Sequence, residues 1–439
     1  MEINKSLVKG SIILLFAFGI YNFFNSVFQL TMARMLSITD YGILATIFSF
    51  IYILSVFSES IQLIISKYTA NEDNKGKVKN IIKKSLKKSF LISSLVFLIY
   101  LLVAIYLSDL LKIEYYLLSI GGVIIFSSFL LPVTRGVMQG KKRFSSLGIN
   151  MVSESLLKLV LSILFVFIGF RVYGVIIGVI IGFIVSFVFS FYSIRDILAV
   201  KEKIVKTIGI YDYAKPAFFI TLITILFYSI DIIIARIVFS PEISGMYAIA
   251  SILSKSIFWG TNPISKAMFP LSAENQKNEA PPHPKGGGLN GARFLDARES
   301  PHSKEGGFQD SRHNINDKKS KNVFLNAFLI LFVLIIIALT LFYFYPSFIV
   351  KIFSGKTILE SANILFYLGL GTSMISLANL ILIYKLSLGK IRGYYYLFIF
   401  TVIEILLLFY FSNNLFEFSI AFVTASSALL FGSIFFMND

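Results

Sequence analysis

Charged side chains inside apolar segments are the features of this sequence most suited to chemistry. Lys158 and Lys255 lie about 16 Å from the nearer membrane surface if each segment is a helix rising about 1.5 Å per residue. Glu404 lies near the middle of a third segment. Charged groups at this depth are costly, so each is a candidate functional residue. Because ammonium groups pair with phosphate oxygens, Lys158 and Lys255 are candidate ligands of an anionic substrate.

Four carboxylates in the apolar segments are candidates for carrying a proton or sodium ion: Asp231, Glu59, Glu154 and Glu404. Structural roles stay open beside this one. Glu154 precedes Lys158 by one helical turn, the order that favours an ion pair. Asp231 and Lys255 lie at similar depth on consecutive segments, so they are also candidates for an inter-helix pair. Glu59 lies near one end of its segment, where its side chain either reaches the interface or stays protonated.

Two arginines occupy equivalent places in a repeated pattern. Ala33-Arg34 ends one apolar segment and Ala235-Arg236 ends another, and each is followed by an acidic turn containing Gly and Tyr. A second echo links Gly140-Lys141 with Gly389-Lys390. These echoes predict two halves with the same orientation, as in transporters with parallel repeats. The arginines are either interfacial anchors or further ligands of the anion.

The composition excludes a soluble enzyme. Hydrophobic residues are 56% of the 439 residues and charged residues only 15%, too few to cover a water-facing surface. The chain has no Cys, which excludes disulfides and thiolate metal sites. The spacing of its three His matches no metal motif, so we expect no metal and no cofactor. The net charge of +16 is compatible with nucleic acid, an anionic surface or membrane topology.

Twelve apolar stretches are long enough to cross a bilayer, which takes about 20 residues of helix. Their residues do not alternate between apolar and polar types, so they are not barrel strands. We therefore predict an all-α integral membrane protein. The predicted spans are 10–32, 41–66, 89–108, 115–138, 147–170, 172–195, 213–238, 244–268, 323–345, 358–384, 393–412 and 416–437.

The positive charges predict the orientation of these spans. Lys and Arg concentrate in cytoplasmic loops. With both termini inside, 32 of the 40 Lys and Arg residues lie on the cytoplasmic side and 6 lie outside. The cytoplasmic set includes Arg135, which we assign to the loop 135–143. The bulk charge is thus a topology signal, and no nucleic acid is needed to explain it.

One segment breaks the apolar pattern. Residues 272–321 contain all three His and four of the ten Pro, with almost no hydrophobic periodicity. We predict a disordered cytoplasmic insertion here; a regulatory loop and an accidental insertion both stay open. The predicted organisation is an N-terminal six-helix bundle with its linker (1–211), two helices of the C-terminal bundle (212–271), the insertion (272–321) and the last four helices (322–439).

Several short motifs, in order, resemble the polysaccharide-biosynthesis flippases that handle O-antigen-type repeat units. They are Lys9-Gly10, the Ala33–Gly42 turn, Gly245-Met246-Tyr247, Phe269-Pro270 and the Tyr384–Lys390 segment. The resemblance covers the chain except 272–321. Two departures are that insertion and the turn after the ninth span, which lacks the usual Gly-x-x-Tyr. The superfamily also includes multidrug and toxin extrusion transporters and lipid II flippases.

The resemblance implies two six-helix bundles around a central cavity in the cytoplasmic membrane. It also implies transfer of an undecaprenyl-diphosphate-linked oligosaccharide to the outer leaflet, with membrane lipids and a polysaccharide polymerase as partners. On this reading, Lys158, Lys255, Arg34 and Arg236 bind the diphosphate while the halves rock between two states. The alternatives are a cation-coupled multidrug exporter, a lipid II flippase and, less in keeping with the short outer loops, a membrane-embedded glycosyltransferase or polymerase.

Overall fold

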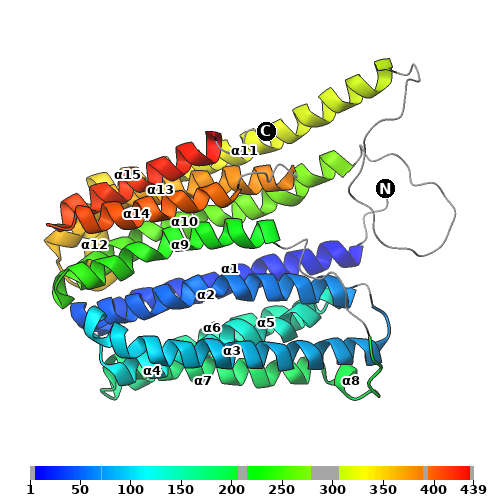
Figure 1. Ribbon diagram of the computed structural model, residues 1–439, viewed down its shortest axis with the longest axis horizontal. Helices are drawn as coiled ribbons and strands as arrows, with labels where there is room; N and C mark the ends of the chain where they lie inside the picture. The colour runs from blue at the N-terminus through cyan, green and yellow to red at the C-terminus, as the bar shows by residue number, and fades with distance from the viewer. Residues whose placement is uncertain (1–4, 71, 206–214, 278–305, 389–393, 436–439) are drawn as a thin grey trace.

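The computed structural model describes residues 5–70, 72–205, 215–277, 306–388 and 394–435. In the N-terminal half, long apolar runs form the helices that the sequence predicts, ending at short polar or glycine-containing turns (Figure 1). These helices are α1 (Lys5–Met35), α2 (Ile38–Ala70), α3 (Lys75–Leu111), α4 (Tyr115–Gly122), α5 (Ile125–Gly140), α6 (Phe144–Phe167), α7 (Arg171–Ser193) and the short α8 (Arg195–Leu198).

The C-terminal half repeats this plan. Its helices are α9 (Lys215–Val238), α10 (Pro241–Lys277), α11 (Gly306–Phe344), α12 (Pro346–Ser354), α13 (Leu359–Ser387), the 3-10 turn η1 (Tyr394–Leu397), α14 (Phe398–Tyr410) and α15 (Leu415–Phe435). Within the described residues, nine helical segments are long and apolar enough to cross a membrane, and Tyr395–Tyr410 is a shorter apolar helix. With α1 and α10 they account for the twelve predicted spans, so the prediction of an all-α, multi-pass membrane protein is confirmed.

The helices pack as two groups. In the N-terminal half α6 packs on α1 and α7, and α2 packs on α5; in the C-terminal half α13 packs on α10 and α15. The groups meet where α2 contacts α9 and α10, and where α1 contacts α12 (Figure 1). The predicted boundary between the halves, at residue 211, lies outside the described residues. The central cavity that the family resemblance implies stays a prediction.

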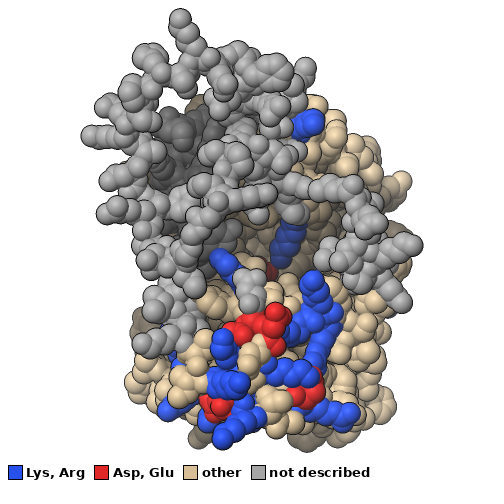
Figure 2. Space-filling model, turned by 90° about the vertical axis from the view of Figure 1, so that its right-hand side faces the viewer, with Lys and Arg blue, Asp and Glu red and all other residues tan. Residues whose placement is uncertain are grey.

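The two ends of the bundle differ in charge. The end that the charge count places in the cytoplasm carries Lys and Arg interspersed with Asp and Glu on the N-terminal half (Figure 2). Part of this charge ties the linker that follows α8 to α3. Lys79 Nζ donates to Val200 O at 2.9 Å, and Asn80 Nδ2 donates to Glu202 at 2.5 Å. We call the opposite end, with the turns after α1, α3 and α9, the outer end.

Two details differ from the sequence-based expectation. Helices α10 and α11 run past the predicted edges of the 272–321 insertion, to Lys277 and from Gly306. The polar residues there contain no proline, so the helices continue beyond the apolar spans; all four prolines fall within 278–305, outside the described residues. Arg135 does not lie in a cytoplasmic loop, because α5 continues to Gly140 and encloses it.

Candidate transport site

A buried ion pair joins α9 and α10 inside the C-terminal half. Lys255 Nζ lies 2.7 Å from Asp231 Oδ1, and the two side chains are 3% and 0% exposed. The other carboxylate oxygen of Asp231 accepts hydrogen bonds from the hydroxyls of Tyr247 at 3.0 Å and Ser251 at 2.7 Å. The inter-helix pairing that the matched depths predicted is therefore present, and Asp231 is satisfied by three donors from one neighbouring helix.

Glu404 lies beside this pair but does not join it. Its side chain is fully buried on α14, and neither of its oxygens has a hydrogen-bond partner among the described residues. The hydroxyl of Thr401, one turn away on the same helix, is also unpartnered and buried. Helix α14 packs on α9, the helix that carries Asp231. Because unsatisfied buried polar groups are rare, this cluster is a candidate place for a transported proton, ion or water.

Lys158 lies in a different setting in the N-terminal half. Its Nζ donates to Asn25 Oδ1 on α1 and lies 4.6 Å from the centre of the Phe28 ring. It does not pair with Glu154, the helical neighbour that the spacing offered. Among the described residues it forms no ion pair, so its ammonium is held at the α1–α6 contact by neutral groups alone.

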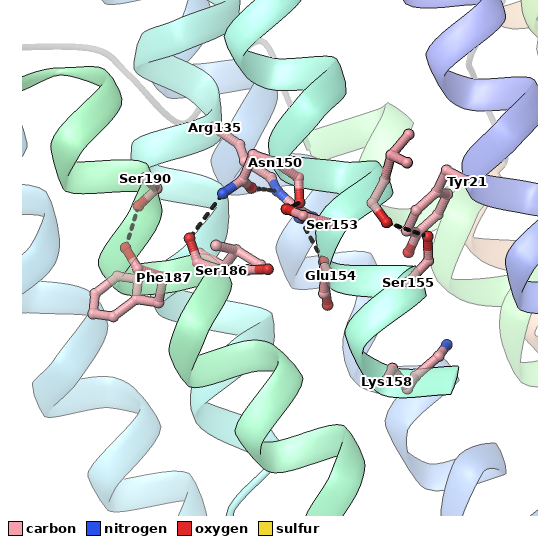
Figure 3. Close-up of polar contacts among 12 residues, drawn as sticks. Tyr21, Arg135, Asn150, Ser153, Glu154, Ser155, Lys158, Ser186, Phe187 and Ser190 are labelled. Atoms are coloured by element: carbon pink, nitrogen blue, oxygen red, sulfur yellow. Dashed lines mark hydrogen bonds and ion pairs between the residues drawn. The ribbon is translucent and has the colours of Figure 1, made fainter. Parts of the chain in front are cut away.

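The partner of Glu154 is Arg135, a residue that sequence reasoning missed. Arg135 Nη2 lies 2.5 Å from Glu154 Oε2, and Arg135 Nε donates to Asn150 Oδ1 at 2.8 Å (Figure 3). Asn150 in turn donates to Ser186 O on α7 at 2.8 Å. The signal that would have found Arg135 is the apolar pair Val137-Met138, which continues the span beyond the arginine.

The N-terminal cluster carries an excess positive charge. Figure 3 shows Arg135 turned toward Glu154 and Asn150, and Lys158 one turn further along α6, pointing toward α1. Two cations thus face one carboxylate. The C-terminal cluster has the reverse composition, with two carboxylates and one cation, so the two halves offer sites of opposite character.

The remaining predicted residues lie at the contact between the halves. Arg34 Nε donates to Ile352 O at 3.0 Å, and Arg236, 1% exposed, donates to backbone carbonyls at the end of α3. Both arginines are at the outer end, as predicted. Glu59 pairs with Lys266 of α10 at 3.1 Å, nearer the cytoplasmic end, and both side chains are more than half exposed.

Aromatic side chains fill the space between the clusters. Trp259 Nε1 donates to the Tyr228 hydroxyl at 2.5 Å, and both rings lie about 6 Å from the ring of Tyr52 on α2. Lys255 Nζ lies 4.8 Å from the centre of the Tyr228 ring. Helix α10 runs without a break through Gly260 and Pro263. No cluster of three or more potential metal ligands occurs in the described part of the chain.

Comparison with known proteins gives one family match and several structural matches. The chain matches the family model of the polysaccharide biosynthesis proteins over residues 7–276. No curated protein sequence matches it. It is similar in structure to an inward-facing multidrug resistance MATE family transporter of the MOP superfamily, with a TM-score of 0.71 and 13% identity over 95% of this chain and 94% of that one.

Two further solved structures have the same fold. An outward-facing MATE family transporter gives a TM-score of 0.64 with 14% identity, covering 99% of this chain and 94% of that one. A MOP superfamily transporter from Pyrococcus furiosus gives 0.57 with 14% identity and the same coverage. The likeness to these structures shows that the chain has the fold of MATE family transporters. Because the family model spans more than half of the residues, the chain belongs to the polysaccharide biosynthesis protein family.

Proposed function

We propose that the chain is a flippase of the cytoplasmic membrane. It moves an undecaprenyl-diphosphate-linked oligosaccharide from the cytoplasmic to the outer leaflet while its two halves alternate between two states. The diphosphate is the part that cannot cross hydrocarbon unaided. The proposal therefore depends on a cation that is available to it inside the membrane.

Lys158 is the observation that carries the proposal. Within the described part of the chain its ammonium has no charged partner: it donates to the neutral Asn25 and lies over the Phe28 ring, and the nearby Glu154 is already paired with Arg135. An anion that approached Lys158 would gain a charge-assisted hydrogen bond without having to displace a carboxylate. Lys255 is paired with Asp231 and the guanidinium of Arg236 is occupied, so binding by either needs a change of state.

The C-terminal cluster supports a role in energy coupling, and we assign the proton as the coupling ion. Both oxygens of Asp231 already accept hydrogen bonds, and the Lys255 ammonium holds the place beside Asp231 where a sodium ion would bind. Hard metal cations need several free oxygen ligands, and Asp231 offers none. A proton on Glu404 would instead remove a buried charge without new ligands.

The test of the substrate is complementation of a flippase-null strain with variants of Lys158. Lys158→Ala is expected to abolish surface glycan at normal protein level, and Lys158→Arg to retain part of it. Lys87→Ala, which removes an exposed lysine of α3, is the matched control and is expected to behave as the parent. Full export by Lys158→Ala would refute the proposal.

The coupling ion is tested in proteoliposomes. A pH gradient is expected to drive transfer of the lipid-linked glycan in the parent, and Glu404→Gln is expected to lose that dependence. Transfer that follows a sodium gradient at constant pH would contradict the assignment. Export of organic cations in place of the glycan would instead identify the multidrug exporter.

A further inference from the structure

Arg236 links the two halves by binding the end of a helix in the other half. From α9 its Nε donates to Leu111 O at 2.7 Å and its Nη2 to Lys112 O at 2.9 Å. These carbonyls end α3, where Lys112 takes the left-handed conformation with a φ of 53°. The last carbonyls of a helix lack partners within it and carry partial negative charge, which a cation satisfies. Arg236 also donates to Ser244 Oγ and Pro241 O in its own half.

Arg34 makes the equivalent contact in the opposite direction. It leaves the end of α1 and donates to Ile352 O in the last turn of α12, which ends at Ser354. Helix α1 is the first span of the N-terminal half, and α9 is the first span of the C-terminal half. The third spans correspond in the same way: α3 ends the third span of the N-terminal half, and α12 directly follows α11, the third span of the C-terminal half. The repeated Ala-Arg pattern thus places one arginine from each half on the same helix end of its counterpart.

Two lysines repeat this exchange. Lys112, after α3, donates to Phe239 O just beyond the end of α9, at 3.4 Å. Lys356, after α12, donates to Ala33 O at 3.4 Å and to Leu36 O at the end of α1. Lys112 lies in the turn whose carbonyls bind Arg236. Lys356 follows α12, the helix whose last turn binds Arg34. We call Arg34, Lys112, Arg236 and Lys356 the outer latch.

Between these cations, α2 and α10 touch backbone to backbone. A Cβ on Gly42 would lie 2.8 Å from the Cα of Gly245, so no other residue fits at this contact without separating the helices. Both glycines belong to the repeated turn. The outer ends of the two halves are therefore in direct contact near the latch.

The cytoplasmic end of the same contact is weaker. In the described residues it holds the exposed pair Glu59–Lys266 and the rings of Phe57 and Phe218, whose centres are 5.4 Å apart. Exposed ion pairs contribute little. The bonds that hold the halves together are thus concentrated at the outer end.

We infer that the outer latch holds the transporter closed to the outside. For the substrate to be released to the outer leaflet, the hydrogen bonds between these four cations and the helix ends of the opposite half must break. Removing one latch cation is then expected to raise the population of the outward-open state. The contacts within each half remain in both states, so they do not contribute to the difference.

The test measures opening directly and needs no substrate, so its result is independent of the proposed function. Ala45 of α2 is 3% exposed and packs in the hydrophobic cluster of the C-terminal half, so opening at the outer end uncovers it. The chain has no Cys, and Ala45→Cys therefore provides a single site for a membrane-impermeant thiol reagent added outside. When closing is faster than labelling, the rate is proportional to the open population.

Arg236→Ala is expected to raise the labelling rate of Ala45→Cys about 30-fold, the equivalent of about 2 kcal/mol at 1.4 kcal/mol per factor of ten. Arg171→Ala is the matched control, because Arg171 also lies at the outer end but pairs with Asp40 in its own half. Ala104→Cys, buried within the N-terminal half, reports unfolding.

Faster labelling of Ala45→Cys alone supports the latch. If Arg236→Ala also raises labelling of Ala104→Cys, the arginine is needed for folding, and Arg34→Ala, whose side chain is exposed, decides the question by the same readout. An unchanged rate in both Arg236→Ala and Arg34→Ala, or an equal rise in Arg171→Ala, would overturn the inference.

Discussion

The Asp231–Lys255 pair leads to an asymmetric prediction for the free energy of unfolding. Lys255→Met removes the cation from a site where both side chains are almost fully buried, leaving Asp231 with two hydroxyl donors. Breaking a buried ion pair from one side costs about 3 to 5 kcal/mol. Asp231→Asn is expected to cost less, about 1 to 3 kcal/mol, because Glu404 is close and has no other partner to satisfy.

The double variant Asp231→Asn/Lys255→Met is expected to lie close to the less damaging single change. An apolar or neutral pair of similar volume needs no compensation, so the coupling energy is about 3 to 5 kcal/mol, the cost of Lys255→Met alone. The assay is reversible unfolding in mixed micelles, applied to the parent, both single variants and the double variant. Lys266→Met is the matched control on the same helix, where the exposed pair with Glu59 is worth at most about 1 kcal/mol.

The reasoning fails if Lys255→Met costs no more than Lys266→Met, or if the two single changes add in the double variant. If Asp231→Asn costs as much as Lys255→Met, the pair exists but Glu404 does not take over the lysine. That outcome would also weaken the assignment of Glu404 as the mobile proton site.

Three further predictions use other parts of the molecule. Arg135→Ala is expected to lower the free energy of unfolding by about 3 kcal/mol or more, because it leaves Glu154 and Asn150 without their buried partner; unfolding that matches the parent would contradict the cluster. Gly245→Ala is expected to speed external labelling of Ala45→Cys, whereas Gly260→Ala, where a Cβ meets nothing within 4 Å, is not; equal rates would remove the close helix contact from the argument. The Arg143 guanidinium holds the pKa of Asp196 well below its ordinary range. The contribution of the Arg143–Asp196 pair to stability is therefore present above about pH 4 and lost as the pH falls further. Asp196→Asn should therefore have a lower midpoint temperature of thermal unfolding than the parent at neutral pH, and the two midpoints should converge in acid. A difference in midpoint temperature that persists in acid would contradict the pairing.

The sequence was sufficient for the spans because apolar length is a one-dimensional property. It was also sufficient for Asp231 and Lys255, since two consecutive antiparallel helices share a depth scale. The partner of Lys158 was out of reach, because Asn25 is contributed by a helix remote in sequence and helix neighbours cannot be read from one chain. Arg135 was misplaced for a simpler reason: a charged residue near the end of a span was counted with the loop that follows it.

The repeat was recognised from the sequence, but the contacts that its arginines make depend on how the helices pack. Arg34 and Arg236 were expected to be either interfacial anchors or ligands of the anion. In the structure each donates to a helix end of the opposite half, which no spacing rule within one half predicts. Glu404 shows the same limit from the other side, because the absence of a hydrogen-bond partner is visible only after every neighbour has been placed.

The exchanged contacts of Arg34 and Arg236 have an evolutionary consequence. When two identical subunits meet across a two-fold axis, residue i of one contacts residue j of the other, and j contacts i. The two arginines, the two lysines and the two glycines follow that rule within a single polypeptide. A six-helix ancestor that paired with its own copy would have acquired both arginine contacts from a single substitution. After fusion of two copies each contact could diverge alone, so the two halves were free to specialise in opposite charge without losing the surface that joins them.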